Sequence, residues 1–141
     1  MTAGYSKTPL HKKLGVKPGC DVVLVDPPDW LAGVVAIEGI GLLTAITRTD
    51  KPGQERDIIH YFTKSADELF VTLPTLKSCI RQNGMIWVSW PKKASKVPTD
   101  ITEDVIRNYA LSIGLVDVKV CAVDDIWSGL KLVIPVKDRT K

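Results

Sequence analysis

Short apolar runs divide this chain into evenly spaced segments. Continuous runs predict strands at 21–26, 42–47, 57–63, 85–90, 115–123 and 130–136. The first, Asp21 to Asp26, is rich in Val and does not alternate with polar residues. That pattern is typical of a strand buried on both faces, as in a parallel sheet.

Two short helices are predicted in the first third of the chain. Thr8 is placed to cap a helix over 9–14 that begins with Pro9, and Gly15 follows it. Asp29 is placed to cap a second helix over 29–37, which two glycines weaken.

Two longer helices are predicted in the rest. Ser65 and Glu68 form a capping box that starts a helix ending at Asn83-Gly84, with Pro74 kinking or restarting it. Asp100 is placed to cap the last helix, which ends at Gly114.

The alternation of these elements predicts a single α/β domain over 1–141, with a basic N-terminal segment and short helix in 1–20. The expected fold has three layers and is Rossmann-like. Its six-stranded sheet is mostly parallel, has the order 2-1-3-4-6-5, and closes with an antiparallel hairpin. From Asp57 onward the pattern resembles the methyltransferase variant of this architecture, which implies a fold and no function.

Three sequence segments carry a further resemblance. They read TPLHKKLG at 8–15, WPK at 90–92, and KVCAVDDIWSGL at 119–130. Together they resemble a small bacterial family described as a domain of unknown function, and the likeness covers nearly the whole chain. The resemblance implies a bacterial cytoplasmic protein and brings no catalytic residue. The acidic Asp26-Pro27-Pro28-Asp29 segment departs from the family's pattern.

Composition narrows the class of protein. Among 141 residues, 45% are hydrophobic and 25% are charged, as in an ordinary globular domain. The net charge is +3, with lysines at both ends, but no aromatic residues alternate with them, so nucleic acid is not an expected partner. No membrane span is expected. Three cysteines without a C-x-x-C pair fit a reducing cytoplasm, and no metal site is expected.

The carboxyl end of the first strand decides which ligands fit. In Rossmann domains a glycine-rich turn there brings backbone N–H groups to a phosphate. Pro27 and Pro28 have no N–H, and Asp26 and Asp29 repel phosphate. Dinucleotides and S-adenosylmethionine are therefore disfavoured, and no cofactor is expected.

The same segment also resembles the D-P-P-aromatic motif of amino-group methyltransferases. Asp29 displaces Trp30 by one position from the place of the aromatic residue. The favoured interpretation is a stiff turn from strand to helix.

The main candidate site lies at the end of the fourth strand. Trp90, Lys92 and Lys93 follow that strand, and Lys64 and Ser65 follow the third. Because neighbouring parallel strands end at the same edge, these side chains and the helix start at Ser65 are expected to bind an anion. The alternative is an exposed loop with solvated lysines.

A secondary candidate consists of Asp124, Trp127 and Ser128, for which a turn is the favoured role. His60 is interpreted as a core histidine, and no catalytic residue is assigned. The sequence thus predicts a non-catalytic Rossmann-like protein that binds a small anionic ligand or a protein partner. The alternative is an enzyme of methyltransferase-like ancestry whose atypical site lacks the glycine-rich cofactor loop.

Overall fold

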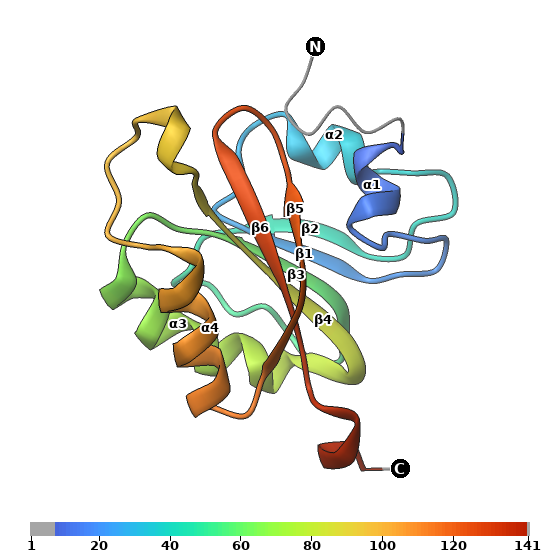
Figure 1. The fold of residues 1–141 in the computed structure, drawn as a ribbon. Coiled ribbons are helices and arrows are strands. Elements are labelled where there is room, and N and C mark those ends of the chain that lie inside the picture. The colour runs from blue at the N-terminus through green and yellow to red at the C-terminus, as the bar shows by residue number, and fades with distance from the viewer. Residues whose placement is uncertain (1–7, 141) are drawn as a thin grey trace.

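The computed structural model describes residues 8–140 and contains one six-stranded sheet (Figure 1). The first seven residues of the basic N-terminal segment lie outside this part. The sheet has the order β2-β1-β3-β4-β6-β5, with β1 to β4 parallel and β6 antiparallel to both β4 and β5, as the sequence predicts. The strands are β1 (Val22–Val25), β2 (Leu43–Ile46), β3 (Arg56–Phe62), β4 (Ile80–Pro91), β5 (Val116–Ala122) and β6 (Trp127–Val133).

Helices cover both faces of the sheet (Figure 1). One face carries α1 (Leu10–Lys13) and α2 (Leu31–Val35), and the other carries α3 (Ala66–Cys79) and α4 (Glu103–Ser112). Two 3₁₀ turns follow β4 and β6: η1 (Lys93–Ser95) and η2 (Val136–Asp138). The buried side chains form two clusters, one on each face, so the sheet is the middle layer of three.

The connection from β2 to β3 contains no helix. Residues 47–55 cross between these strands as an irregular loop, whereas the connection from β3 to β4 contains α3. On the α3 side of the sheet, this loop therefore stands where a crossover helix would otherwise cover β1 and β2.

Three predicted helix caps are wrong. The N-cap residue of α1 is Pro9 rather than Thr8, without a side-chain cap hydrogen bond. The residue at the start of α2 is Trp30, without a side-chain cap, and the helix is only five residues long. Thr102 caps α4 by accepting the Val105 N–H at 3.2 Å. Asp100 instead accepts the N–H of Ala66 at 2.7 Å, so it fixes the segment before α4 against the first turn of α3.

Pro74 does not restart α3, since the helix is continuous from Ala66 to Cys79. A proline inside a helix has no N–H for the carbonyl four residues earlier, which here is Phe70. The hydroxyl of Tyr109 on α4 donates to that carbonyl at 2.7 Å. The neighbouring helix thus satisfies the acceptor that Pro74 leaves open.

The predicted end of α3 at Asn83-Gly84 is wrong. The helix ends at Cys79, and β4 begins at the next residue. Arg56 of β3 pairs with Ile80, and the register then shifts before Ile58 pairs with Met85. A Cβ at Gly84 would lie 3.0 Å from the carbonyl oxygens of Arg56 and Asp57. Gly84 therefore marks a bulge at which two backbones approach closely.

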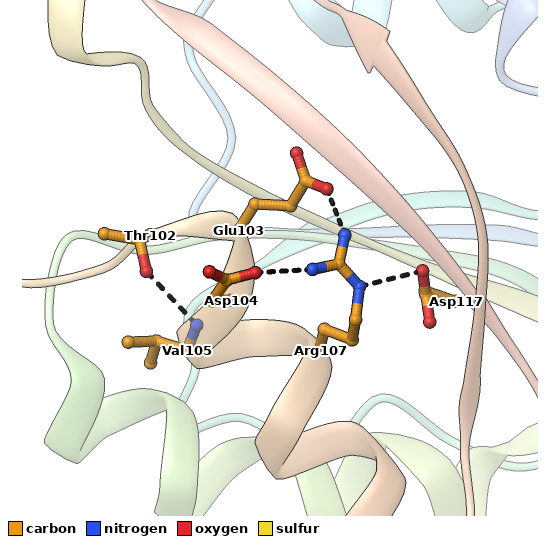
Figure 2. A network of polar contacts seen from close by, with 6 residues as sticks. All are labelled: Thr102, Glu103, Asp104, Val105, Arg107 and Asp117. Carbon is orange, nitrogen blue, oxygen red and sulfur yellow. Dashed lines mark hydrogen bonds and ion pairs between the residues drawn. The ribbon is translucent and has the colours of Figure 1, made fainter.

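An ion-pair network joins α4 to the edge strand β5 (Figure 2). Arg107 pairs with Glu103 and Asp104 of its own helix, and its Nε lies 3.1 Å from Asp117 Oδ2 on β5. The guanidinium thereby holds the C-terminal hairpin against the helix that precedes it.

Candidate functional site

A pocket of about 400 Å³ lies where the carboxyl ends of β1 and β3 separate. From β1 the chain passes to β2 on one side, and β3 lies on the other, so this is the point at which the strand order reverses. Ligands of open α/β sheets bind at such a point. We call it the switch-point pocket; it is lined by Asp26, Pro27, Pro28, Phe62, Thr63, Lys64, Ser65, Glu68 and Trp127.

Asp26 forms one side of this pocket with an unusual backbone. Its φ is 52°, in the left-handed region that glycine adopts most readily. Its N–H donates to the Ile46 carbonyl at 2.8 Å, and the two prolines that follow have no N–H. Side chains, rather than backbone amides, therefore make the polar surface on this side.

The opposite side comes from the end of β3 and the start of α3. The Thr63 hydroxyl accepts the Ser65 N–H at 3.2 Å, and Ser65 Oγ accepts the Glu68 N–H at 3.2 Å. The cap predicted at Ser65 is confirmed. These bonds place the exposed Lys64 side chain and the Glu68 carboxylate at the same pocket.

Aromatic rings form the third wall. Phe62 meets Trp127 edge to face, with ring centroids 5.1 Å apart, and stacks on His60 at 4.3 Å. His60 is 1% exposed and its Nε2 lies 2.7 Å from Ser89 Oγ. Burial lowers the pKa of His60 to about 3, so the ring is neutral at physiological pH. It is a core histidine, as expected from the sequence.

The structure separates the residues of the main predicted site. Lys64 and Ser65 line the switch-point pocket, but Trp90, Lys92 and Lys93 do not. Trp90 is 7% exposed and packs in the core beneath α3 and α4, so its indole is not available to a ligand there. Lys92 and Lys93 follow β4 at the same sheet edge, where the Lys92 N–H donates to the Ile126 carbonyl at 2.7 Å.

The secondary candidate forms a turn, as expected. Asp124 Oδ1 accepts the N–H groups of Ile126 and Trp127, at 2.9 and 2.7 Å. Ser128 pairs with Trp90 in the sheet, and only Trp127 of the three candidate residues reaches the switch-point pocket.

Sequence reasoning gave no binding role to Phe62, Thr63 or Glu68, which also line the pocket. In the sequence Glu68 is part of a capping box, which indicates a helix start and no ligand. The D-P-P segment at the end of β1 and the predicted Lys64-Ser65 pair at the end of β3 are the sequence signals that point to this place.

A second pocket, of about 700 Å³, lies beside the first. It is lined by the last residues of β1 and β2, loop residues 48–54, and α3 from Val71 to Cys79, and we call it the loop pocket. Arg48 lines the loop pocket and Glu68 lines the switch-point pocket. Arg48 Nε lies 3.2 Å from Glu68 Oε1, so this ion pair stands between the two pockets.

Residues 8–140 lack two further features. No cluster of His, Cys, Asp and Glu side chains there is arranged to hold a metal ion. None of the helices in this range combines the length and the apolar character that crossing a membrane requires.

Comparison with known proteins gives matches of structure only. No family model matches the chain, and no curated protein is similar to it in sequence. A SAM-dependent methyltransferase from Aquifex aeolicus is similar in structure, with a TM-score of 0.68 and 16% identity over 87% of this chain and 86% of that one.

Two other solved structures share the fold. The ribosomal protein L11 methylase of Lactobacillus delbrueckii subsp. bulgaricus has a TM-score of 0.63 and 14% identity, over 89% of this chain and 74% of that one. The magnesium protoporphyrin IX methyltransferase of Synechocystis PCC 6803, with bound SAM, has a TM-score of 0.58 and 12% identity, over 87% and 74%.

These matches confirm the methyltransferase-like Rossmann architecture. They contradict the expectation that the chain is not an enzyme, because proteins that share its fold over most of their length are methyltransferases. At identities this low the likeness establishes the fold only.

Proposed function

We propose that this protein is an S-adenosylmethionine-dependent methyltransferase whose cofactor binds in the switch-point pocket through side chains. The observation that carries the proposal is the placement of two carboxylates, one ammonium group and an aromatic wall around a pocket at the strand reversal. The fold that it shares with methyltransferases supports the same reaction class.

The chemical groups of S-adenosylmethionine match this lining. The cofactor carries a sulfonium and an ammonium cation, a carboxylate and an adenine ring. Asp26 and Glu68 offer negative charge, and Lys64 offers positive charge. Phe62 and Trp127 offer ring surfaces to the adenine or to the sulfonium. The residues present therefore fit the cofactor, although the usual glycine-rich turn is absent from β1.

Each side chain has a distinct task in this proposal. When bound, the cofactor supplies an electrophilic methyl group. Lys64 and the Ser65 hydroxyl bind the carboxylate, and Asp26 binds the ammonium group. The Glu68 carboxylate accepts the proton of the acceptor atom.

Isothermal titration calorimetry of the full chain with S-adenosylhomocysteine tests the proposal. Lys64→Ala should weaken binding about tenfold, because a charged hydrogen bond is lost. Asp26→Asn should also weaken it. Lys93→Ala is the matched control, since this lysine is at the same sheet edge but outside the pocket, and it should bind like the wild type.

Two results would refute the proposal. One is that neither S-adenosylhomocysteine nor S-adenosylmethionine binds the wild-type protein. The other is that Lys64→Ala and Lys93→Ala bind the ligand equally well.

The cellular setting is part of the same proposal. A bacterial cytoplasmic protein agrees with the sequence resemblance and with Cys20, Cys79 and Cys121, which are all free thiols.

A further inference from the structure

The loop pocket is held in shape by its own loop. Both the N–H and the hydroxyl of Thr47 donate to Asp50 Oδ2, at 2.9 and 3.1 Å. Arg56 Nε donates to the Pro52 carbonyl at 2.9 Å. Gly53, at a φ of 88°, leaves room for the Arg56 guanidinium, which a Cβ there would strike at 2.1 Å. The pocket is therefore preformed, which favours binding because little order must be gained.

The lining of the loop pocket points to one class of ligand. Val25, Ile46 and Leu76 give it apolar surface, and Arg48 and Lys51 bring two cations from the loop. The Asp50 carboxylate is already engaged by Thr47. The lining suits a molecule with an apolar body and one anionic group.

Arg48 can change partners because its present ion pair is weak. The side chains of Arg48 and Glu68 are 37% and 43% exposed, and ion pairs this exposed to water contribute little to the free energy of folding. A ligand anion in the loop pocket would compete with Glu68 for the same guanidinium.

The hydroxyl of Tyr61 is buried near residues of both pockets. Tyr61 Oη is buried and has no hydrogen-bond partner among the described residues. Burial raises the pKa of Tyr61, and Thr63 of one pocket and Thr72 of the other oppose the shift. Tyr61 is not among the residues that line either pocket, so its hydroxyl belongs to the core beneath them.

We propose that the loop pocket holds the methyl acceptor, an apolar molecule with one anionic group, and that this anion takes Arg48 from Glu68. This inference rests on the proposed function, because it assigns the second substrate of the same reaction. Binding of the acceptor then releases the Glu68 carboxylate towards the switch-point pocket.

Atoms and electrons balance when the methyl group is transferred to the acceptor in this arrangement. A lone pair of the acceptor's nucleophilic atom forms the new bond to the methyl carbon. The electron pair of the broken carbon–sulfur bond stays on sulfur, which becomes a neutral thioether. The proton of the acceptor atom passes to Glu68, so no oxidant or reductant is needed.

Fluorescence titration with 8-anilinonaphthalene-1-sulfonate, an apolar aromatic body with one sulfonate, tests the site in the full chain. Thr75→Phe places a ring in the loop pocket and should weaken binding at least about tenfold. Arg48→Gln should also weaken binding. Glu68 lies outside the loop pocket. Glu68→Gln should therefore tighten binding of the probe about two- to fivefold, because it frees Arg48. Leu111→Phe adds a ring to the exposed surface of α4 and should leave binding unchanged.

The outcomes separate this inference from the proposed function. Equal binding of the probe by the wild type and Thr75→Phe would overturn the location of the site. Unchanged or weaker binding by Glu68→Gln would overturn the exchange at Arg48. If S-adenosylhomocysteine binds while either result is found, only this inference fails. If the probe behaves as expected but S-adenosylhomocysteine does not bind, the proposed function fails and the acceptor role fails with it.

Discussion

His60 should make the protein lose stability in mild acid. The imidazole ring of His60, on β3, is buried in the core, and its Nε2 lies at hydrogen-bonding distance from Ser89 Oγ. Burial lowers its pKa from 6.5 to about 3. The unfolded chain binds a proton near pH 6.5, whereas the folded protein binds one only near pH 3. The stabilising contribution of the neutral ring is therefore complete above pH 6.5 and is lost as the pH falls towards 3.

The size of the loss follows from these two pKa values. From neutral pH to about pH 5, the difference in proton binding lowers the free energy of unfolding by about 2 kcal/mol. That is a large fraction of the stability of a small domain.

Urea unfolding followed by tryptophan fluorescence, at several pH values between about 8 and 5, measures this effect. His60→Gln removes the titrating ring, so its stability should be lower at neutral pH but should fall less with acid. His11→Gln, on α1, is the control and should keep the wild-type pH dependence. Parallel curves for the wild type and His60→Gln would refute the reasoning.

Three further changes have defined outcomes. Asp26→Gly should raise the free energy of unfolding by up to about 1 kcal/mol, because glycine adopts the left-handed backbone freely. The same change should weaken S-adenosylhomocysteine binding. Urea unfolding and calorimetry measure the two effects, and a loss of stability would contradict the first. Thr102→Ala should cost about 1 kcal/mol in thermal unfolding, because the Val105 N–H loses its cap, and an unchanged melting temperature would count against this role. Burial raises the pKa of Cys121, so a thiol reagent should modify it slowly in the native protein and fully after unfolding, and fast native labelling would contradict this.

The strand order could be predicted because it depends on features that the sequence shows directly. Alternating strand and helix patterns limit a parallel sheet to a few topologies. The boundary between α3 and β4 could not be predicted, because it is set by a contact across the sheet. Asn83-Gly84 is a common turn signal, but pairing of Ile80 with Arg56 draws this segment into the strand.

The site was predicted less well because it depends on which face each strand residue occupies. Trp90 has the same parity along β4 as Ile86 and Val88, so its ring points into the core under α3 and α4. Reading Trp90 as the exposed end of a strand missed this. β4 continues to Pro91 because β6 begins as early as Trp127 and pairs with it, which short apolar runs do not reveal.

The hydrogen bond from the Tyr109 hydroxyl to the Phe70 carbonyl, which Pro74 leaves without an intrahelical partner, fixes the position of α3 along α4. If α3 slid by one turn along α4, the hydroxyl would face a carbonyl that already has an intrahelical partner, and Phe70 would be left with none. The helix that forms a wall of both pockets is thus fixed in register. A change in the shape of the loop pocket can then come from residues 47–55 and not from sliding of α3.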